Sequence, residues 1–591
     1  MRRFKKITAL GLCVSMLFTL NGCSFFFEIK EKDENKNVSE EFTEICDELF
    51  QYTLESDSFN AHFTVTDPKD YGITFDEEDY TLGTISLKDS EEYYDYINEK
   101  HESLLALDYR KLSEDEQLTY DILCTYLEKQ LAYEGTDELC NLFAPNSGII
   151  GNLSTNFIEY QFYDAEDVEH YLLYLKDVPN YMEQIYDFTR EQAPKGYFMS
   201  DQVVDQVIDM CENYINAENE PLLITFEDKI AELDISDEDK IKYIRLNEEY
   251  VEEYYLPVYQ QSIDLLEELR GSGTNDGGLA GYGELGEKYY AAIVSQKTSS
   301  DMTPEEAAEY LDNAMEDVIN QMYDVIMEDA NVYTESLSYQ PDFETPEEVL
   351  EFVLDNMSDK FPDPYTLNYA IEYQNPACEI EGTLAYYVQC RIDDISVNNI
   401  KVNGSAVEGD ALTMYFTLAH EGYPGHLYQF TASNGNEDIP KIRKILDFIG
   451  TTEGWAEYAS TLCADYLDIS DNLKEMLYIN DIFSYILCSR LDVGVNYEGW
   501  TVDEAKDYLS LYIECDDELV EDLYYTVVGD PGICLPYTIG HLYMRDLRAD
   551  AEDALGKAFD EKEYHQFLMD LGIAPFEVIE NELDKWLAEQ K

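Results

Sequence analysis

The chain has 591 residues, and its 38 Lys and Arg against 126 Asp and Glu give a formal charge of −88. A hydrophobic content of 45% with 13% aromatics excludes a disordered polyacid, so a large core forms beneath an acidic surface. Nucleic-acid binding is excluded as a function, because neutralising phosphates requires clusters of Lys and Arg. The charge indicates either a preference for cationic peptides or simply a strongly solvated surface.

Residues 1–22 have the pattern of a bacterial lipoprotein signal. Four basic residues precede the apolar run Ile7–Leu20, which ends at Leu20-Asn21-Gly22-Cys23. The run is too short for a comfortable transmembrane helix, which needs about 20 apolar residues. We expect lipidation of Cys23 and an extracytoplasmic protein anchored to the bacterial cell membrane, with a mature charge of −92 after loss of four cations and no acid. The alternative is an ordinary secretory signal in which Cys23 is incidental.

The rest of the chain predicts a mainly α-helical fold. Residues 23–38 are predicted to be a tether, followed by an N-terminal helical region over 39–275 and a catalytic helical region over 276–591. The Gly-rich stretch 271–278 marks the boundary. Apolar residues at helical spacing predict long amphipathic helices; these cover Asp164–Arg190, Val204–Ile215, Lys240–Arg270 and Pro304–Leu337.

One stretch favours β structure. Leu384–Val402 alternates and is rich in β-branched and aromatic residues, which predicts a short hairpin or edge strand near the active site. Besides Cys13 and Cys23, the remaining ten cysteines form no CxxC pair, so we expect mostly buried thiols. Cys378–Cys390 is the one candidate bridge.

Two of the seven histidines lie within one motif, His420-Glu421-Gly422-Tyr423-Pro424-Gly425-His426. A zinc-binding HExxH helix places its two histidines four residues apart on one face, whereas here they are six apart. Pro424 occupies the usual ligand position and must end the helix near Tyr423. Gly425 then leaves the backbone free to bring His426 round to the same metal as His420.

Two histidines cannot hold a catalytic zinc alone, so a third ligand is needed for one Zn²⁺ per chain. Glu453 is the candidate, with Glu457 one turn later as a competing ligand or an outer carboxylate. Glu421 is the candidate general base, which takes a proton from water and delivers it to the leaving amine. For the donor to the oxyanion, Tyr537 is the first candidate and His541 the second.

At these residues the sequence resembles the bacterial domain-of-unknown-function 885 family, whose members look like gluzincin-type zinc metallopeptidases. The family motif HExxPGH matches His420–His426, a following EGWA segment matches Glu453–Ala456, and the similarity covers most of the mature chain. The resemblance implies that His420, His426 and Glu453 are zinc ligands and that Glu421 is the general base. Tyr537 matches a family position, and an edge strand would bind the substrate backbone as in gluzincins.

The sequence therefore predicts a membrane-anchored, extracytoplasmic zinc hydrolase that cleaves peptide bonds. A first alternative is a lipoprotein that only binds peptides, with a vestigial or structural metal site. A second is a zinc amidase or esterase that acts on non-peptide substrates. The intact Glu421 favours an enzyme, because binding alone needs no general base.

Overall fold

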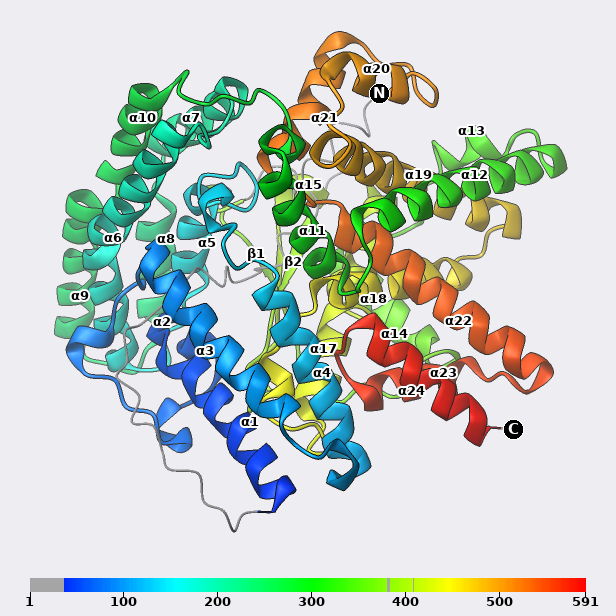
Figure 1. Cartoon of the computed structure of the whole chain (residues 1–591), viewed down its shortest axis with the longest axis horizontal. Helices are drawn as coiled ribbons and strands as arrows, with labels where there is room; N and C mark the ends of the chain where they lie inside the picture. Colours follow the sequence, from blue (N-terminus) through cyan, green and yellow to red (C-terminus); the bar gives the residue numbers. More distant parts are fainter. Residues whose placement is uncertain (1–36, 380–382, 408, 591) are drawn as a thin grey trace.

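The computed structural model describes residues 37–379, 383–407 and 409–590. It is mainly helical with one small sheet, which confirms the predicted fold class. Figure 1 shows α5 to α10 on one side of the molecule, α22 to α24 on the other, and the strands with α17 and α18 between them. Cys23 and most of the predicted tether lie outside the described residues.

The N-terminal helices form two groups. The first packs beside the centre and comprises α1 Val38–Glu55, α2 Ser58–Thr64, α3 Leu87–Leu105 and α4 Glu114–Leu131. The second has its own hydrophobic cluster and comprises α5 Ile149–Glu159, α6 Ala165–Gln192, α7 Asp201–Ile215, α8 Pro221–Glu232, α9 Asp237–Tyr250 and α10 Pro257–Leu269. The helix predicted over Lys240–Arg270 is interrupted by a π-helical turn at Val251–Tyr255, because Pro257 cannot donate a backbone hydrogen bond.

The next helices are α11 Glu284–Thr298, α12 Pro304–Glu328, α13 Val332–Ser336 and α14 Pro346–Asn356. The prediction of one helix over Pro304–Leu337 is wrong, since α12 ends at Glu328 and α13 starts at Val332. The carboxylate of Asp329 accepts a hydrogen bond from the backbone N–H of Asn331 at 2.9 Å. This local turn competes with helix continuation, as Asp and Asn side chains commonly do.

The sheet has three strands in the order β1-β3-β2: β1 Ala370–Tyr373, β2 Ala385–Val388 and β3 Asn399–Val402. Strands β2 and β3 are antiparallel, which confirms the predicted hairpin, and β2 forms an edge. Strand β1 pairs parallel to β3 and was not predicted, because none of its four residues is buried and they carry no alternating pattern.

The candidate Cys378–Cys390 bridge is not formed, because both residues are free buried thiols. Cys378 precedes the start of β2 and Cys390 follows its end, so an extended strand separates them. The Cys390 thiol instead accepts a hydrogen bond from the Asn434 side chain at 3.5 Å.

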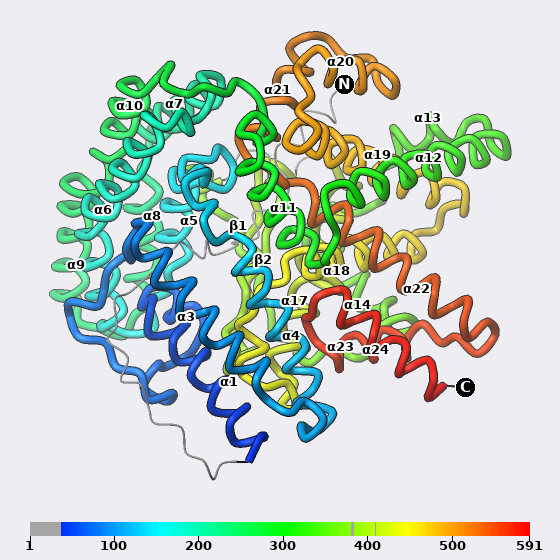
Figure 2. Tube along the Cα trace, in the orientation of Figure 1, coloured from blue at the N-terminus to red at the C-terminus, as the bar shows by residue number. Residues whose placement is uncertain are grey.

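The C-terminal part carries ten helices among its described residues: α15 Gly404–Val407, α16 Ala411–Glu421, α17 His426–Gly435, α18 Ile449–Leu462, α19 Asp471–Asn496, α20 Val502–Leu509, α21 Asp517–Gly529, α22 His541–Leu555, α23 Glu561–Leu571 and α24 Phe576–Glu589. A π-helical turn, Pro536–Gly540, leads directly into α22. Figure 2 shows α17 and α18 in the middle of the trace, between the first helices and the last ones. Within the described ranges, no helix is long and apolar enough to cross a membrane.

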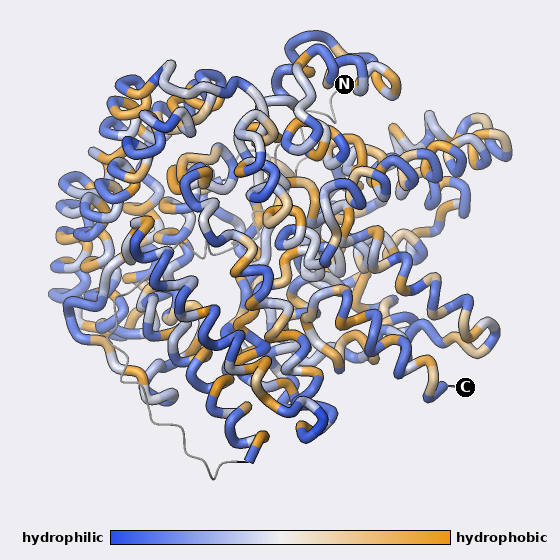
Figure 3. The backbone as a smooth tube through the Cα atoms, in the orientation of Figure 1, coloured by the Kyte–Doolittle hydropathy of each residue, from blue (hydrophilic) through white to orange (hydrophobic). Residues whose placement is uncertain are grey.

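One hydrophobic core surrounds these central helices. It joins residues of α1, α3 and α4 to residues of α14, the sheet, α16 to α18 and α22 to α24. The core therefore combines segments from both sides of the Gly-rich stretch 271–278, and the division into two regions at that stretch stays a prediction. Figure 3 shows hydrophilic positions spread along the outlying helices, in keeping with a charge carried mostly by the surface.

Helix α18 packs closely against the turn before α22, and glycines lie at the points of contact. A Cβ added at Gly454 would lie 2.4 Å from the backbone carbonyl carbon of Gly540, and one added at Gly540 would lie 2.0 Å from the carbonyl oxygen of Gly450. Because the obstructing atoms belong to the backbone, no side-chain rotation can relieve such a contact.

We predict that Gly454→Ala destabilises the protein by about 1–3 kcal/mol, the usual cost of overpacking a close contact. The control is Gly151→Ala in α5, where the added methyl meets only the flexible end of Met210 at 3.8 Å. Thermal unfolding should show a lower midpoint for Gly454→Ala and an unchanged or higher midpoint for Gly151→Ala. Equal midpoints for the two variants would contradict the close contact.

Candidate metal centre

A turn between α16 and α17 brings the two histidines of the motif together. Helix α16 ends at Glu421 and α17 begins at His426, as Pro424 predicts. A Cβ at Gly425 would lie 1.8 Å from the carbonyl oxygen of His420, so only glycine fits this turn. The indole N–H of Trp455 donates to the Pro424 carbonyl at 3.0 Å and holds the turn against α18. The two imidazole rings consequently lie 4.6 Å apart, centre to centre.

Glu453 of α18 completes a cluster of three possible metal ligands. Its Oε2 atom lies 3.5 Å from Nε2 of His420 and 3.3 Å from Nε2 of His426. Two ligands at about 2.0–2.1 Å from a tetrahedral zinc lie roughly 3.3–3.4 Å apart, which matches both distances. The exposed fractions of these residues are 9% for His420, 1% for His426 and 0% for Glu453.

The charges and the unsatisfied atoms of the cluster also suit a cation. Oε1 of Glu453 is buried and has no hydrogen-bond partner among the described residues. Burial opposes charge on His420, but Glu453, Glu457 and Glu421 together raise its pKa to about 10. Burial likewise acts to raise the pKa of Glu453, yet the two histidines bring it below its usual value. Two imidazoles and one carboxylate are a donor set that binds zinc with an open position.

Glu457 lies behind His420 rather than at the ligand atoms. Its Oε1 lies 3.5 Å from Nδ1 of His420, on the opposite side of the ring from Glu453. The Tyr485 hydroxyl of α19 donates to the same oxygen at 2.9 Å. A carboxylate in this position selects the tautomer that leaves Nε2 free for a metal. The geometry therefore favours Glu453 as the ligand and Glu457 as the outer carboxylate.

Glu421 faces the cluster from the end of α16. Its Oε1 lies 4.0 Å from Nε2 of His420, and its Oε2 accepts the backbone N–H of Tyr387 in β2 at 2.8 Å. Burial raises the pKa of the carboxyl above its ordinary value. One oxygen is thus fixed by the edge strand, while the other is directed at the space beside the histidines.

The two candidates for the oxyanion donor lie in the π-helical turn and at the start of α22. Tyr537 is buried in the π-helical turn and stacks on Tyr485, with ring centres 6.2 Å apart. His541 begins α22 and is fully buried, and neither ring nitrogen has a hydrogen-bond partner among the described residues. Burial, Arg545 and His420 together hold the pKa of His541 well below its usual value, so its imidazole is neutral.

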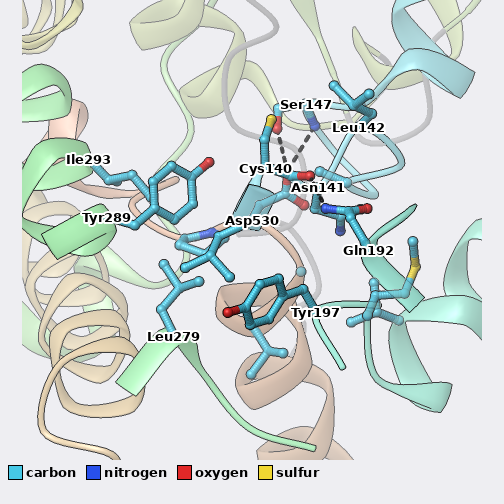
Figure 4. Close-up of a pocket in the computed structure, with 18 of the residues that line it drawn as sticks. Cys140, Asn141, Leu142, Ser147, Gln192, Tyr197, Leu279, Tyr289, Ile293 and Asp530 are labelled. Atoms are coloured by element: carbon cyan, nitrogen blue, oxygen red, sulfur yellow. Dashed lines mark hydrogen bonds between the residues drawn. The ribbon is translucent and has the colours of Figure 1, made fainter. Parts of the chain in front are cut away.

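One of two cavities in the described part of the chain adjoins this centre. The one that His426 and Glu453 line has a volume of about 150 Å³ and is walled by α1, α2 and the end of β2. A larger cavity of about 260 Å³ is lined by none of the predicted site residues. Figure 4 shows this larger cavity between Tyr197, Leu279, Tyr289 and Ile293, with Asp530 hydrogen-bonded to Ser147 at one side.

Sequence reasoning missed three residues of the centre. Tyr387 fell within the predicted hairpin, but nothing marked its backbone N–H as the partner of Glu421. Tyr485 is one of 50 tyrosines and has no motif around it. Trp455 could have been found, because it lies within the EGWA segment beside Glu453 and is one of only three tryptophans.

The chain belongs to the family described as bacterial protein of unknown function (DUF885), whose model matches residues 68–583. Among curated proteins, none matches the chain. Among solved structures, the chain is similar to a "putative lipoprotein" from Colwellia psychrerythraea, with 16% identity, a TM-score of 0.78, and coverage of 94% of this chain and 100% of that one. It is also similar to a "putative lipoprotein of unknown function" from Shewanella oneidensis, with 14% identity, a TM-score of 0.59, and coverage of 93% and 100%. At these identities the likeness shows the fold alone.

We predict that purified protein binds about one zinc per chain and that His420→Ala abolishes this binding, because the variant keeps only two ligands. Glu457→Gln should bind zinc roughly 10–100-fold more weakly, the usual effect of removing an outer carboxylate. Metal content by mass spectrometry and competition with a zinc chelator measure both effects. His101→Ala, which alters the other His-Glu dipeptide of the chain, is the control and should retain the metal. Equal metal content in wild type and His420→Ala would refute the site.

Proposed function

We propose that the protein is a zinc-dependent hydrolase that cleaves peptide bonds. The observation that supports this most strongly is the buried cluster of His420, His426 and Glu453 with the carboxylate of Glu421 beside it. A structural zinc site is closed by four protein ligands, whereas three ligands and an adjacent base are the pattern of a catalytic site. Bound there, zinc would supply a Lewis acid that lowers the pKa of water and polarises a carbonyl.

The residues around the zinc would then have three different roles in the reaction. Glu421, held by the Tyr387 N–H, would accept a proton from the attacking water through its free oxygen and pass it to the leaving amine. Glu457 would keep the His420 imidazole in one tautomer and orientation. Tyr537, or else the neutral His541, would donate a hydrogen bond to the oxyanion.

The edge strand gives a reason to favour peptide substrates. Among the described strands, β2 pairs with β3 alone, and the N–H of Tyr387 points away from that partner toward Glu421. Backbone groups at an open strand edge can pair with an extended peptide. A peptide bound along β2 would place its own backbone beside the catalytic carboxylate. An ester or a small amide has no extended backbone that could pair with the strand.

We further propose that the mature protein is a lipoprotein anchored outside the cytoplasm through Cys23. The lipoprotein-type signal at residues 1–22 supports this placement. So do the two similar structures, each of which is described as a "putative lipoprotein". A substrate would then be a peptide on the outer side of the membrane.

We predict that Glu421→Gln keeps the zinc but loses at least about 10²-fold in rate, because the amide cannot accept the proton. Hydrolysis of a mixed peptide library, followed by mass spectrometry, measures the loss alongside the metal content. Glu437→Gln, at an exposed position near the end of α17, makes the same chemical change away from the site and should hydrolyse as wild type does. Retention of full activity by Glu421→Gln would refute the mechanism. Binding of peptides by the wild type without any cleavage would favour a peptide-binding lipoprotein.

A further inference from the structure

Asp447 lies on the wall of the cavity that holds two of the proposed zinc ligands. It precedes α18 by two residues and lines the 150 Å³ cavity together with His426 and Glu453. Most of the surrounding wall is apolar; it includes Phe430, Ile445, Leu446, Ile449 and Ile573. The carboxylate is therefore a charged group in a mainly apolar cavity beside the proposed catalytic centre.

The Asp447 carboxylate makes no hydrogen bond and no ion pair with any described residue. Two buried aspartates, by contrast, are well satisfied. Asp530 accepts hydrogen bonds from Asn146 and Ser147, as part of the wall of the larger cavity (Figure 4). Asp492 accepts from the Tyr290 hydroxyl and from the Gly532 N–H. Asp447 itself is half-buried, and a carboxylate that lines a cavity without a partner is open to a ligand that enters the cavity.

The charged groups around Asp447 leave it available to a ligand. Burial raises its pKa to about 6, Lys297 of α11 acts to lower it, and Glu453 acts to raise it. Lys297 forms no ion pair within the described part of the chain, and its side chain lines the larger cavity instead. Burial and the Asp447 carboxylate both raise the pKa of the Tyr126 phenol in α4. Lys444 lines the same cavity, but its ammonium donates to the backbone carbonyl of Asn434 at 2.7 Å. A ligand ammonium would therefore compete with no existing salt bridge.

We propose that Asp447 is a substrate-recognition residue that pairs with an alkylammonium group of the peptide beside the catalytic centre. This inference rests on the proposed function and gives it a substrate class. A water molecule needs about 10–15 Å³ of such a cavity, so 150 Å³ has room for roughly ten waters, or the end of one peptide. A carboxylate from the substrate would instead be repelled by Asp447 and Glu453.

An ammonium group can come from two parts of a peptide. The α-ammonium would make the protein an aminopeptidase, and the side chain of a lysine would make it select basic residues. The chemistry at Asp447 is the same in both cases, because each source presents a compact cation with three donors. Matched peptides separate the two sources.

The experiment compares wild type with Asp447→Asn, both zinc-loaded and lacking residues 1–23. One substrate pair differs only in a free or acetylated N-terminus, and a second pair differs only in a lysine or a norleucine. We expect Asp447→Asn to raise KM about tenfold or more for the cationic member of one pair, with kcat nearly unchanged, as loss of a buried charged partner should. The neutral member should be unaffected, and the pair that responds identifies the source of the ammonium.

Two further variants make this test specific. Asp438→Asn removes a charge at an exposed position nine residues earlier and should leave every KM unchanged. Lys297→Met removes the cation that acts to lower the pKa of Asp447, and it should lower KM for the cationic peptides. Equal discrimination between cationic and neutral peptides by wild type and Asp447→Asn, with Lys297→Met also without effect, would overturn the inference.

A binding measurement separates this inference from the proposed function. Calorimetry on Glu421→Gln, with and without Asp447→Asn, measures the affinity for the same four peptides. If no peptide is cleaved by wild type but the cationic peptides bind in an Asp447-dependent way, the subsite stands and the hydrolase proposal fails. If peptides are cleaved and Asp447 affects neither binding nor KM, the hydrolase stands and the subsite fails. Absence of both cleavage and binding refutes both.

Discussion

The structure around the proposed centre depends on one buried carboxylate, that of Glu453, placed between two imidazoles. A lone carboxylate without contact to water would cost several kcal/mol, so positive charge has to be brought to it. His420 and His426 approach Oε2 from one side, while Oε1 remains without a hydrogen-bond partner among the described residues. The glycine-bearing turn between α16 and α17 and the close packing of α18 at Gly454 make this approach possible.

Three glutamates near one histidine have different environments and therefore different proposed roles. Glu453 meets the Nε2 atoms, Glu457 meets Nδ1 with help from the Tyr485 hydroxyl, and Glu421 is held by a strand N–H at the open side. The carboxylate chemistry is the same in each case. What distinguishes a ligand, an orienting group and a base is which atom of the neighbouring residue the carboxylate faces.

Most of the acidic residues that give the chain its large negative charge are not part of the proposed site. The charge of −88 is carried mostly by exposed side chains, which screen one another in water and contribute little to the site. A few enclosed carboxylates serve the architecture instead. Asp530 and Asp492 fasten the segment that leads to Tyr537, the first to the loop before α5 and the second to α19 and α11. The composition alone could not separate these acids from the solvated majority.

The sequence by itself determined the mainly α-helical class, the β2–β3 hairpin and the pairing of His420 with His426. These features are encoded locally, in apolar spacing, in alternation, and in a proline and a glycine placed between two histidines. Local signals also led to the wrong prediction of one helix over Pro304–Leu337. The apolar pattern continues beyond Asp329, where a local turn ends α12. Only the tertiary structure decided that Glu457 faces Nδ1, that the Tyr387 N–H holds Glu421, and that Asp447 stands without a partner. The physical reason is that these relationships arise between elements that are distant in sequence. The chain has many tyrosines and acidic residues, and no local pattern marks which of them lie at the centre.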